Sequence, residues 1–252
     1  MTGDPDFPVA GVPKTLLSVA FRGLPLLTHA QQRYSIVSIM HHMSPTAATI
    51  KAVIFDWGGV LEALPNAAAF AEWETRLGLA PASLQPILWG PVWEQVEQGT
   101  ATVADYEAEV CRLCGFTRRA QLEEFYSAFY PQQLHDEMLA ALHALRGRYQ
   151  VALLTNAFQG QDQHIARLTG KHPTQLVDHY VNSSDVGMRK PMPAIFQLTL
   201  ERLGVQPDEA IFIDDNPVNV AAARAAGLHV IPFETPAQAL GTLKALLGHP
   251  IE

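Results

Sequence analysis

The sequence predicts an α/β protein with a doubly wound, parallel, Rossmann-like sheet core that is interrupted by an all-helical insert. Two observations support this prediction. From residue 149 onward, short apolar runs alternate with helical patterns, which is typical of parallel sheets. Between the first apolar run and that region, residues 65–147 show helical apolar spacing and no strand-like run.

The composition of the chain limits the classes of protein to which it can belong. The chain has 252 residues, of which 48% are hydrophobic, so it can bury a sizeable core. Its net charge of −8 argues against nucleic acid or an anionic membrane as the main partner. No apolar run approaches the ~20 residues that a membrane helix needs. Cys111 and Cys114 lack a second ligand pair for zinc, so we interpret them as reduced cysteines of a cytoplasmic protein.

The N-terminal segment differs from the rest of the chain. Residues 1–48 are rich in Pro, His and Ser, and their apolar pieces are short and interrupted. We interpret them as a disordered extension, or as the result of a start site placed upstream of a true start at Met43. The first predicted strand follows at Ala52–Phe55, an apolar run that ends on Asp56 and two glycines.

Glycines punctuate the helical insert, several of them at helix-end positions. The predicted helices are Ala67–Leu77, Pro91–Gln98, Val103–Leu113, Ala120–Phe129 and Leu134–Leu145. Because no strand separates them, we assign residues 64–147 to one helical domain. We interpret its tryptophans, Trp73, Trp89 and Trp93, as packing residues, and the alternative is that one of them faces a substrate pocket.

The C-terminal half alternates strand and helix. The predicted strands are Val151–Leu154, Asp178–Asn182, Ala210–Ile213 and His229–Phe233, and the predicted helices are Pro193–Leu203, Val218–Ala226 and Pro236–Leu247. Gly204 and Gly227 follow two of these helices, as expected at helix ends. Together with the first strand, these elements place the core domain at residues 49–63 and 148–252.

Polar residues follow three of the predicted strands: Asp56, Thr155-Asn156 and Asp214-Asp215. Because the carboxyl ends of parallel strands meet at one edge of a sheet, we expect these side chains to converge. Lys190 lies in the loop between the last two groups. Clustered carboxylates repel each other unless a cation joins them, and Mg²⁺ prefers such hard oxygen ligands. The set indicates phosphoryl transfer in which an aspartate attacks phosphorus.

Four motifs in this order resemble those of the haloacid dehalogenase superfamily. They are Phe55-Asp56-Trp57-Gly58-Gly59-Val60-Leu61, Leu153-Leu154-Thr155-Asn156, Arg189-Lys190-Pro191 and Ile213-Asp214-Asp215-Asn216-Pro217-Val218-Asn219. No single motif identifies the superfamily, whereas four of them in the right order are strong evidence for the resemblance. The helical insert resembles the cap of this superfamily, which closes over the site and selects the substrate.

This resemblance implies a Mg²⁺-dependent phosphatase that hydrolyses a small phosphate ester through an aspartyl-phosphate on Asp56. Thr155 and Asn156 would bind the phosphate, and Lys190 would steady both the nucleophile and the phosphate. The implied metal ligands are Asp56, the backbone carbonyl of Gly58, Asp215 and, through water, Asp214.

One position departs from the pattern of the superfamily. Most of its phosphatases have a second Asp two residues after the nucleophile, acting as general acid and base, and Gly58 stands there instead. The loss of positioned proton transfer can cost on the order of 10²–10⁴ in rate. The motifs Gly187-Met188-Arg189-Lys190-Pro191 and Asp214-Asp215-Asn216 resemble those of the bacterial α-D-glucose-1-phosphate phosphatase branch, which carries such a glycine. A sugar phosphate is therefore the expected substrate.

Two further residues near these motifs have open interpretations. Glu62 is the spare acid nearest to Asp56 in sequence, and we interpret it as a solvated residue at the base of the cap linker. Replacement of the missing Asp is the alternative role for Glu62. Asn219 is expected either to bond nearby backbone or to support Asp214.

Gly58 also leaves other functions open. One alternative is a catalytically idle scaffold that binds a phosphate ligand or a protein. Another is a metal-free 2-haloacid dehalogenase, which would leave the pair Asp214-Asp215 without a compensating cation. Phosphonate hydrolysis is disfavoured, because it uses a cap lysine and no lysine occurs between Lys51 and Lys171.

Overall fold

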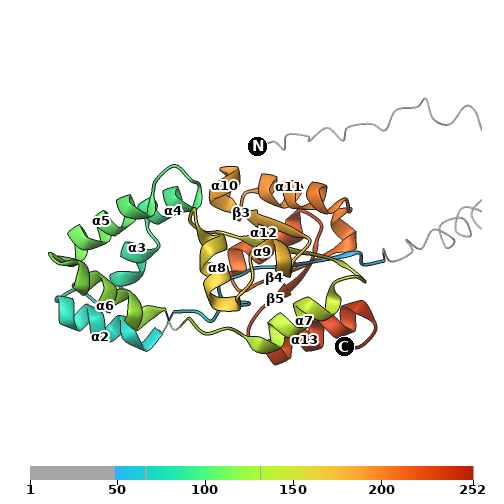
Figure 1. The fold of residues 1–252 in the computed structure, drawn as a ribbon, viewed down its shortest axis with the longest axis horizontal. Coiled ribbons are helices and arrows are strands. Elements are labelled where there is room, and N and C mark those ends of the chain that lie inside the picture. Colours follow the sequence, from blue (N-terminus) through green and yellow to red (C-terminus); the bar gives the residue numbers. More distant parts are fainter. Residues whose placement is uncertain (1–48, 66, 131, 252) are drawn as a thin grey trace, which may run out of the picture. The chain divides into compact units, whose positions relative to one another are not determined.

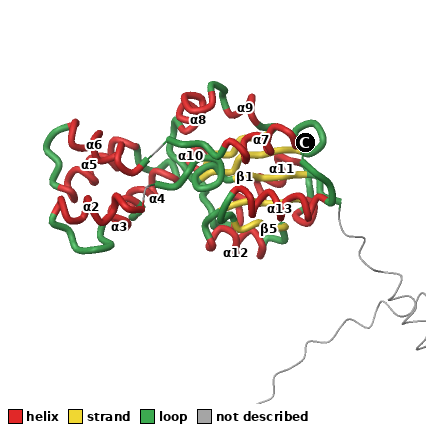
Figure 2. The backbone as a smooth tube through the Cα atoms, turned by 90° about the horizontal axis from the view of Figure 1, so that it is seen from below, coloured by secondary structure: helices red, strands yellow, loops and turns green. Residues whose placement is uncertain are grey.

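The computed structural model describes residues 49–65, 67–130 and 132–251. The predictions for residues 1–48, including a start at Met43, lie outside these described residues. Figure 1 shows the order of the elements, and Figure 2 shows the strands with helices on either side. None of the described helices is long and apolar enough to cross a membrane.

A parallel sheet forms the core of the described chain. Its strands are β1 (Ala52–Phe55), β2 (Gln150–Thr155), β3 (His179–Asn182), β4 (Ala210–Asp214) and β5 (His229–Pro232). Their order in the sheet is β3-β2-β1-β4-β5, and every neighbouring pair is parallel. This order confirms the predicted doubly wound core. It also places the residues that follow β1, β2 and β4 side by side at the carboxyl edge of the sheet.

Side chains of the strands alternate between two layers of helices. In β1, Val53 and Phe55 face one layer, and Ala52 and Ile54 face the other. The first layer contains α7 (Asp136–Leu145), α8 (Gln161–Thr169), α9 (Pro173–Leu176) and α13 (Pro236–Leu247), and the second contains α11 (Pro193–Leu203) and α12 (Pro217–Ala225). Because β1 is packed on both faces, the residue that follows it is held in a fixed place.

The helical insert has a hydrophobic core of its own. Its helices are α2 (Ala67–Leu77), α3 (Leu84–Leu88), α4 (Pro91–Glu97), α5 (Val103–Cys114) and α6 (Arg119–Phe129). Aromatic rings fill this core: Trp73 meets Phe125 edge to face with 5.2 Å between ring centroids, and Phe125 lies 4.7 Å from Phe129. Trp89 is partly exposed and packs on Phe70 at 5.5 Å. These helices confirm the all-helical insert.

The end of the insert differs from the prediction. We placed Leu134–Leu145 in the helical domain, but Met138, Leu142 and Leu145 of α7 pack with the strands of the sheet. The apolar stripe identified the helix, but a stripe does not specify which surface it covers. The packing therefore assigns α7 to the core.

Several short elements were not predicted. They are α3, α8, α9, α10 (Ser183–Val186) and the 3₁₀ turn η2 (Pro207–Glu209). Four of them contain fewer than two helical turns, and α8 is largely polar, so none shows a clear apolar period.

Candidate active site

The parallel register brings three acidic residues to one place. Phe55 pairs with Ile213 on the neighbouring strand, so Asp56 and Asp214 follow at the same level. The amide of Asp56 donates a hydrogen bond of 2.9 Å to the carbonyl of Ile213. Asp56, Asp214 and Asp215 each offer a carboxylate oxygen within 4.8 Å of the others. The expected convergence at the carboxyl edge is therefore present.

Lys190 lies between two of these carboxylates. Its Nζ is 2.8 Å from Asp56 Oδ1 and 2.7 Å from Asp214 Oδ2. The Lys190 side chain is 1% exposed, and that of Asp214 is fully buried. Burial favours the neutral amine, but the charges of Asp214 and Asp56 outweigh it and raise the pKa of Lys190. The ammonium therefore stays charged inside the site.

Asp56 has one oxygen engaged and one open. Its Oδ1 accepts a hydrogen bond of 2.7 Å from the Trp57 amide in addition to the contact with Lys190. No donor among the described residues reaches Oδ2. Burial raises the pKa of Asp56 despite the opposing charge of Lys190, and the charges of Asp214 and Asp215 add to this rise. The open oxygen is available to a cation or an electrophile.

Two asparagines fix the groups around this ion pair. Asn219 donates from Nδ2 to both oxygens of Asp214, at 3.1 and 3.2 Å, which confirms the alternative in which it supports that carboxylate. Asn156 donates from Nδ2 to the Lys190 carbonyl and accepts from the Lys190 amide at Oδ1, each at 2.8 Å. The binding of phosphate by Asn156 stays a prediction, and its side chain positions the Lys190 backbone.

Gly59 and Asp215 approach each other closely at the same edge. A Cβ added to Gly59 would lie 2.5 Å from the carboxylate carbon of Asp215, and Gly59 has a φ of +82°. Glycine is the residue that satisfies both requirements. Burial and the charge of Asp214 raise the pKa of half-buried Asp215. Thr155, the last residue of β2, is buried at this edge as well.

The negative charge of the clustered carboxylates exceeds the positive charge that contacts them. Asp56, Asp214 and Asp215 form the acidic cluster of the described chain, and Lys190 contacts two of its members. Burial is the main cause of the raised pKa values of Asp56 and Asp215, and the charge of Asp214 adds to the rise in both. A set of hard carboxylate oxygens with too little positive charge fits Mg²⁺ or a similar divalent cation.

Residues 50–227 match the family of haloacid dehalogenase-like hydrolases. The chain belongs to this family. Membership agrees with the resemblance that the four motifs carry, and it makes the protein a haloacid dehalogenase-like (HAD-like) hydrolase.

Two known relatives align with most of this chain. Mouse acyl-CoA dehydrogenase family member 10 is 33% identical over 213 residues, which cover 80% of this chain and 19% of the mouse protein. D-Ribitol-5-phosphate phosphatase from Bacteroides thetaiotaomicron is 27% identical over 207 residues, which cover 79% of this chain and 99% of that enzyme. This chain therefore spans about a fifth of the mouse relative.

A solved structure shows the same fold. A HAD family enzyme from Bacteroides thetaiotaomicron, crystallised in complex with magnesium and inorganic phosphate, superposes with a TM-score of 0.61 at 23% identity. The superposition covers 73% of this chain and 94% of that one.

The HAD-like hydrolase has open space at Gly58. This residue is exposed, and a Cβ added there would meet no atom within 4 Å. Gly58 also lies outside the left-handed region that favours glycine, unlike Gly59. Local crowding therefore does not explain why the second Asp of most family phosphatases is missing here.

Glu62 is not the solvated residue that we predicted. Its side chain is 12% exposed, accepts a hydrogen bond of 2.6 Å from Trp57 Nε1 and lies 2.9 Å from His164 Nε2. Because an ionised carboxylate only accepts, His164 Nε2 carries the proton in this contact. The Glu62 backbone also pairs with Leu134 across the two cap linkers. The residue ties the loop after Asp56 to α8 and to the second linker.

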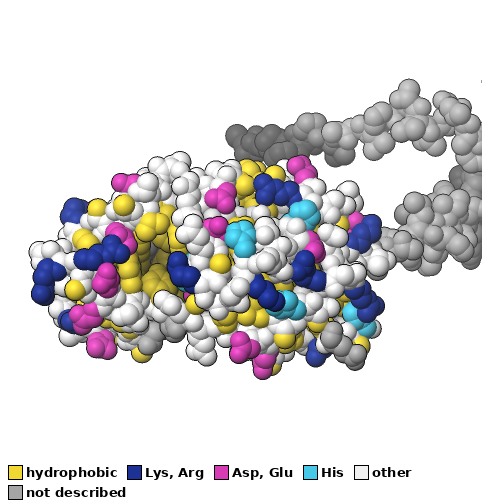
Figure 3. Space-filling view, in the orientation of Figure 1, with side chains coloured by type: hydrophobic (Ala, Val, Ile, Leu, Met, Phe, Trp, Pro, Cys, Tyr) yellow, Lys and Arg dark blue, Asp and Glu magenta, His cyan; other side chains and the backbone are white. Residues whose placement is uncertain are grey.

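Sequence reasoning also missed how the cap, α2–α6, meets the core. Arg189 Nε donates a hydrogen bond of 2.8 Å to Glu97 Oε2 on α4. Trp93 of the same helix lies 6.4 Å from Phe158 in the loop after β2, measured between ring centroids. Figure 3 shows a hollow lined with hydrophobic side chains between the cap helices and the core. The cap thus reaches the carboxyl edge through an ion pair and an aromatic contact.

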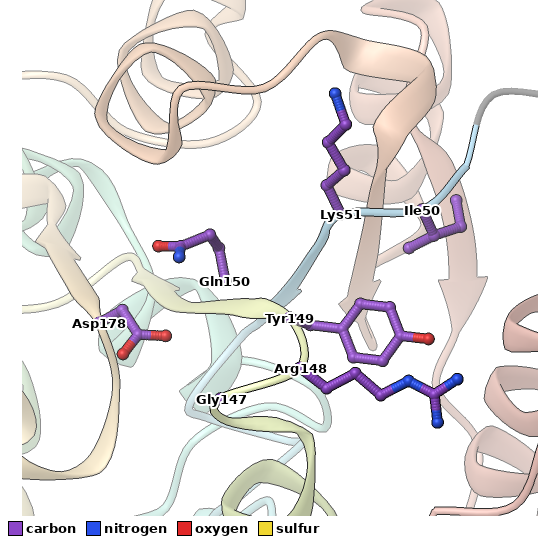
Figure 4. A pocket seen from close by; sticks show the side chains of 7 residues that line it. All are labelled: Ile50, Lys51, Gly147, Arg148, Tyr149, Gln150 and Asp178. Atoms are coloured by element: carbon purple, nitrogen blue, oxygen red, sulfur yellow. The ribbon is translucent and has the colours of Figure 1, made fainter.

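A separate pocket lies at the opposite edge of the sheet, where β1 and β2 begin (Figure 4). Its volume is about 270 Å³, and it is lined by Ile50, Lys51, Gly147, Arg148, Tyr149, Gln150 and Asp178. Lys51 is paired with Glu209 at 2.6 Å, and Asp178 with Arg146 at 3.2 Å. The Lys51 and Arg148 side chains point apart in Figure 4. These lining residues form no convergent set for catalysis.

Proposed function

We propose that this HAD-like hydrolase is a Mg²⁺-dependent phosphatase that hydrolyses a small phosphate ester through an aspartyl-phosphate on Asp56. The observation that carries the proposal is the environment of the Asp56 carboxylate. Lys190 and the Trp57 amide hold one of its oxygens, and no donor in the described chain reaches the other. A carboxylate held on one side in this way is oriented for attack through its free oxygen.

In the first step, Asp56 Oδ2 attacks phosphorus, a new P–O bond forms, and the bond to the ester oxygen breaks. Lys190 stays protonated because its pKa is raised, and it stabilises charge on the phosphoryl oxygens. Thr155, buried at the end of β2, adds a hydroxyl donor. Gly58 has no side chain to donate a proton, so the leaving alkoxide takes its proton from solvent or from the substrate itself.

In the second step, water attacks phosphorus and the bond to Asp56 breaks. Inorganic phosphate leaves, the Asp56 carboxylate is restored, and the proton lost by water passes to solvent. Asn156 keeps Lys190 in place during both steps, because it holds the Lys190 backbone through two hydrogen bonds.

Asp56, Asp215 and the backbone carbonyl of Gly58 would hold Mg²⁺, with Asp214 acting through water. When bound, the cation neutralises the phosphate charge and orients the phosphate toward the nucleophile. The oxygens of Asp214 already accept hydrogen bonds from Lys190, the Asn216 amide and Asn219. This engagement supports an indirect role for Asp214.

We further propose a sugar or polyol phosphate as the substrate. The bacterial relative that aligns over 99% of its length is a D-ribitol-5-phosphate phosphatase. The motif around Lys190 resembles the glucose-1-phosphate phosphatase branch of the superfamily. The anomeric oxygen of a sugar is less basic than an ordinary alkoxide, so it leaves phosphorus more readily, which lessens the need for the acid that is missing at Gly58.

The test is phosphate release from α-D-glucose 1-phosphate, D-ribitol 5-phosphate and a panel of other esters, with Mg²⁺ and with EDTA. We expect turnover that requires Mg²⁺ and is abolished by Asp56→Asn, while the exposed control Asp208→Asn keeps full activity. No release from any ester by the folded, Mg²⁺-loaded protein would contradict the proposal and favour the idle scaffold. Metal-independent halide release from a 2-haloacid would favour the dehalogenase.

Gly58→Asp provides a second test, because the structure has room for this side chain. The variant should raise kcat for alkyl phosphates by up to about 10² by restoring a positioned acid. The gain for α-D-glucose 1-phosphate should be smaller, because its leaving group needs less assistance. Equal gains for both substrates would show that leaving-group quality does not explain the glycine.

A further inference from the structure

A partly buried ion pair joins the cap to the loop that carries Lys190. Arg189 Nε lies 2.8 Å from Glu97 Oε2, and Arg189 Nη1 lies 3.4 Å from Glu94 Oε1. The Glu97 side chain is 9% exposed, whereas that of Glu94 is 53% exposed. The two carboxylates come from the same helix, α4, but only Glu97 lies inside the contact between cap and core.

Residues on either side of Glu97 also contact the core. Burial raises the pKa of Glu97, and the charge of Arg189 opposes the rise. A side chain on Gly99, just after α4, would overlap the carbonyl of Ser184 in α10. Trp93, one turn before Glu97, contacts Phe158 of the core. A buried carboxylate is tolerated in such a place when a specific partner compensates its charge.

Arg189 immediately precedes Lys190 in the chain, and the ammonium group of Lys190 lies between the carboxylates of Asp56 and Asp214. Asn156 holds the Lys190 backbone through two hydrogen bonds, and Lys190 Nζ contacts Asp56 and Asp214. The segment therefore has an anchor on each side: Arg189 is bound to the cap, and Lys190 is bound to the sheet. Loss of the cap anchor frees one end of the segment that positions the ammonium.

We propose that Glu97 is a positioning residue, and that its ion pair with Arg189 couples docking of the cap to the placement of Lys190. Its effect on turnover rests on the proposed phosphatase function, whereas the coupling itself does not. Glu97 acts through Arg189 and takes no part in proton transfer. Substrate turnover thus depends on a cap residue whose partner lies in the core.

The first test measures hydrogen exchange without any substrate. Glu97→Gln should increase exchange in α4 and in residues 183–190, whereas the matched control Glu94→Gln should behave as wild type. Arg189→Met should give the same pattern as Glu97→Gln, and Arg189→Lys a weaker one. Unchanged exchange of residues 183–190 in Glu97→Gln would overturn the proposal, whether or not the wild type hydrolyses any ester.

The second test measures kinetics on the ester that the wild type hydrolyses fastest. Glu97→Gln should lower kcat by about 10- to 100-fold, as expected for a misplaced catalytic group, with KM changed less than kcat. Glu94→Gln should stay within about twofold of wild type, because its contact with Arg189 is longer and exposed. A rise in KM with unchanged kcat would overturn the assignment.

A double variant separates positioning from proton transfer. If Glu97 positions Lys190, Glu97→Gln should lower kcat by the same factor in the Gly58→Asp background as in wild type. Loss of the Glu97→Gln effect in that background would mean that the restored Asp replaces it as acid or base, and it would overturn the proposal. If the wild type hydrolyses no ester, the proposed function fails, and hydrogen exchange alone decides the coupling.

Discussion

The charged groups at the carboxyl ends of β1 and β4 and the tyrosines inside the cap differ in how their buried polar atoms are paired. At the edge, Lys190 contacts Asp56 and Asp214, and Asn219 supports Asp214. Inside the cap, the hydroxyls of Tyr106 and Tyr126 are buried without a hydrogen-bond partner among the described residues. The rings of these tyrosines stack at 6.4 Å within the aromatic core.

The edge of the sheet and the core of the cap therefore use their buried side chains in different ways. The edge fixes charged groups in one arrangement, which suits a reaction whose charge development is always the same. The cap core depends on aromatic packing, in which shape contributes more than individual polar atoms. We therefore expect substitutions at the edge to affect activity most, and substitutions in the cap to affect stability most.

Lys190→Met tests the edge and should have the largest effect. Removal of one charged donor should lower kcat by on the order of 10²–10³. Without Mg²⁺, the free energy of unfolding should fall by about 3–5 kcal/mol, because buried Asp214 and Asp56 lose their partner. Phosphate release and urea unfolding measure the two effects. The exposed control Lys171→Met should match wild type, and a fully active Lys190→Met would refute the role of the ammonium.

Phe125→Ala tests the packing of the cap. This fully buried ring contacts Trp73 and Phe129, and its removal should cost about 3–5 kcal/mol. The cap should then unfold in a separate transition before the core. A comparison of the unfolding curves from tryptophan fluorescence and from circular dichroism measures this separation. In contrast, Phe196→Ala beneath the sheet should shift one common transition. A single transition in both variants would show that cap and core unfold as one unit.

The dependence of stability on pH should reverse when Mg²⁺ is added. Burial raises the pKa of Asp56 and of Asp215, so without a cation the stability from their protonation is complete below about pH 3.9, the unfolded value. That stability is lost as the pH rises through the raised folded pKa. Mg²⁺ binds the ionised carboxylates, so its stabilisation grows with pH over the same window.

Thermal unfolding with and without saturating Mg²⁺ measures this effect. At 100 times the dissociation constant, the cation should add about 2.7 kcal/mol near neutral pH and less in acid. Asp215→Asn should reduce both the pH dependence and the response to Mg²⁺. A Mg²⁺ response that is the same at all pH values would argue against these carboxylates as ligands.

Tyr106→Phe should have the smallest effect and sharpens the comparison of polar atoms. Removal of an unpartnered buried hydroxyl should change the free energy of unfolding by about 0.5 kcal/mol or less, or should stabilise the protein. Tyr149→Phe is the matched change in the core, because its hydroxyl lies 2.6 Å from His249 Nε2. That variant should lose about 1 kcal/mol in urea unfolding. Equal losses would mean that the Tyr106 hydroxyl has a partner after all.

The core could be predicted because its chemistry follows from local patterns. Apolar runs gave the strands, and parallel topology then placed Asp56 beside Asp214. The hydrogen bonds of the Asn156 side chain with the Lys190 backbone could not be predicted, because they depend on the path of a distant loop.

The contacts between cap and core were not predictable in the same way. Arg189 and Glu97 are 92 residues apart, and His164 and Glu62 are 102 residues apart. Neither pair belongs to a local motif, and each depends on how the helices dock on the sheet. The assignment of α7 failed for the same reason, since its apolar stripe suits a sheet as well as a helical bundle.

The two linkers of the cap lie against each other where they leave the sheet. The Ala63 amide donates a hydrogen bond of 2.8 Å to the Gln133 carbonyl, and the His135 amide donates one of 2.9 Å to Leu61. From the side of the sheet, the cap therefore begins and ends at a single point, as an inserted domain does. An insert of another size or fold could join the same two ends without moving a catalytic strand. This geometry lets the helical insert be exchanged as a module while the chemistry of the edge stays the same.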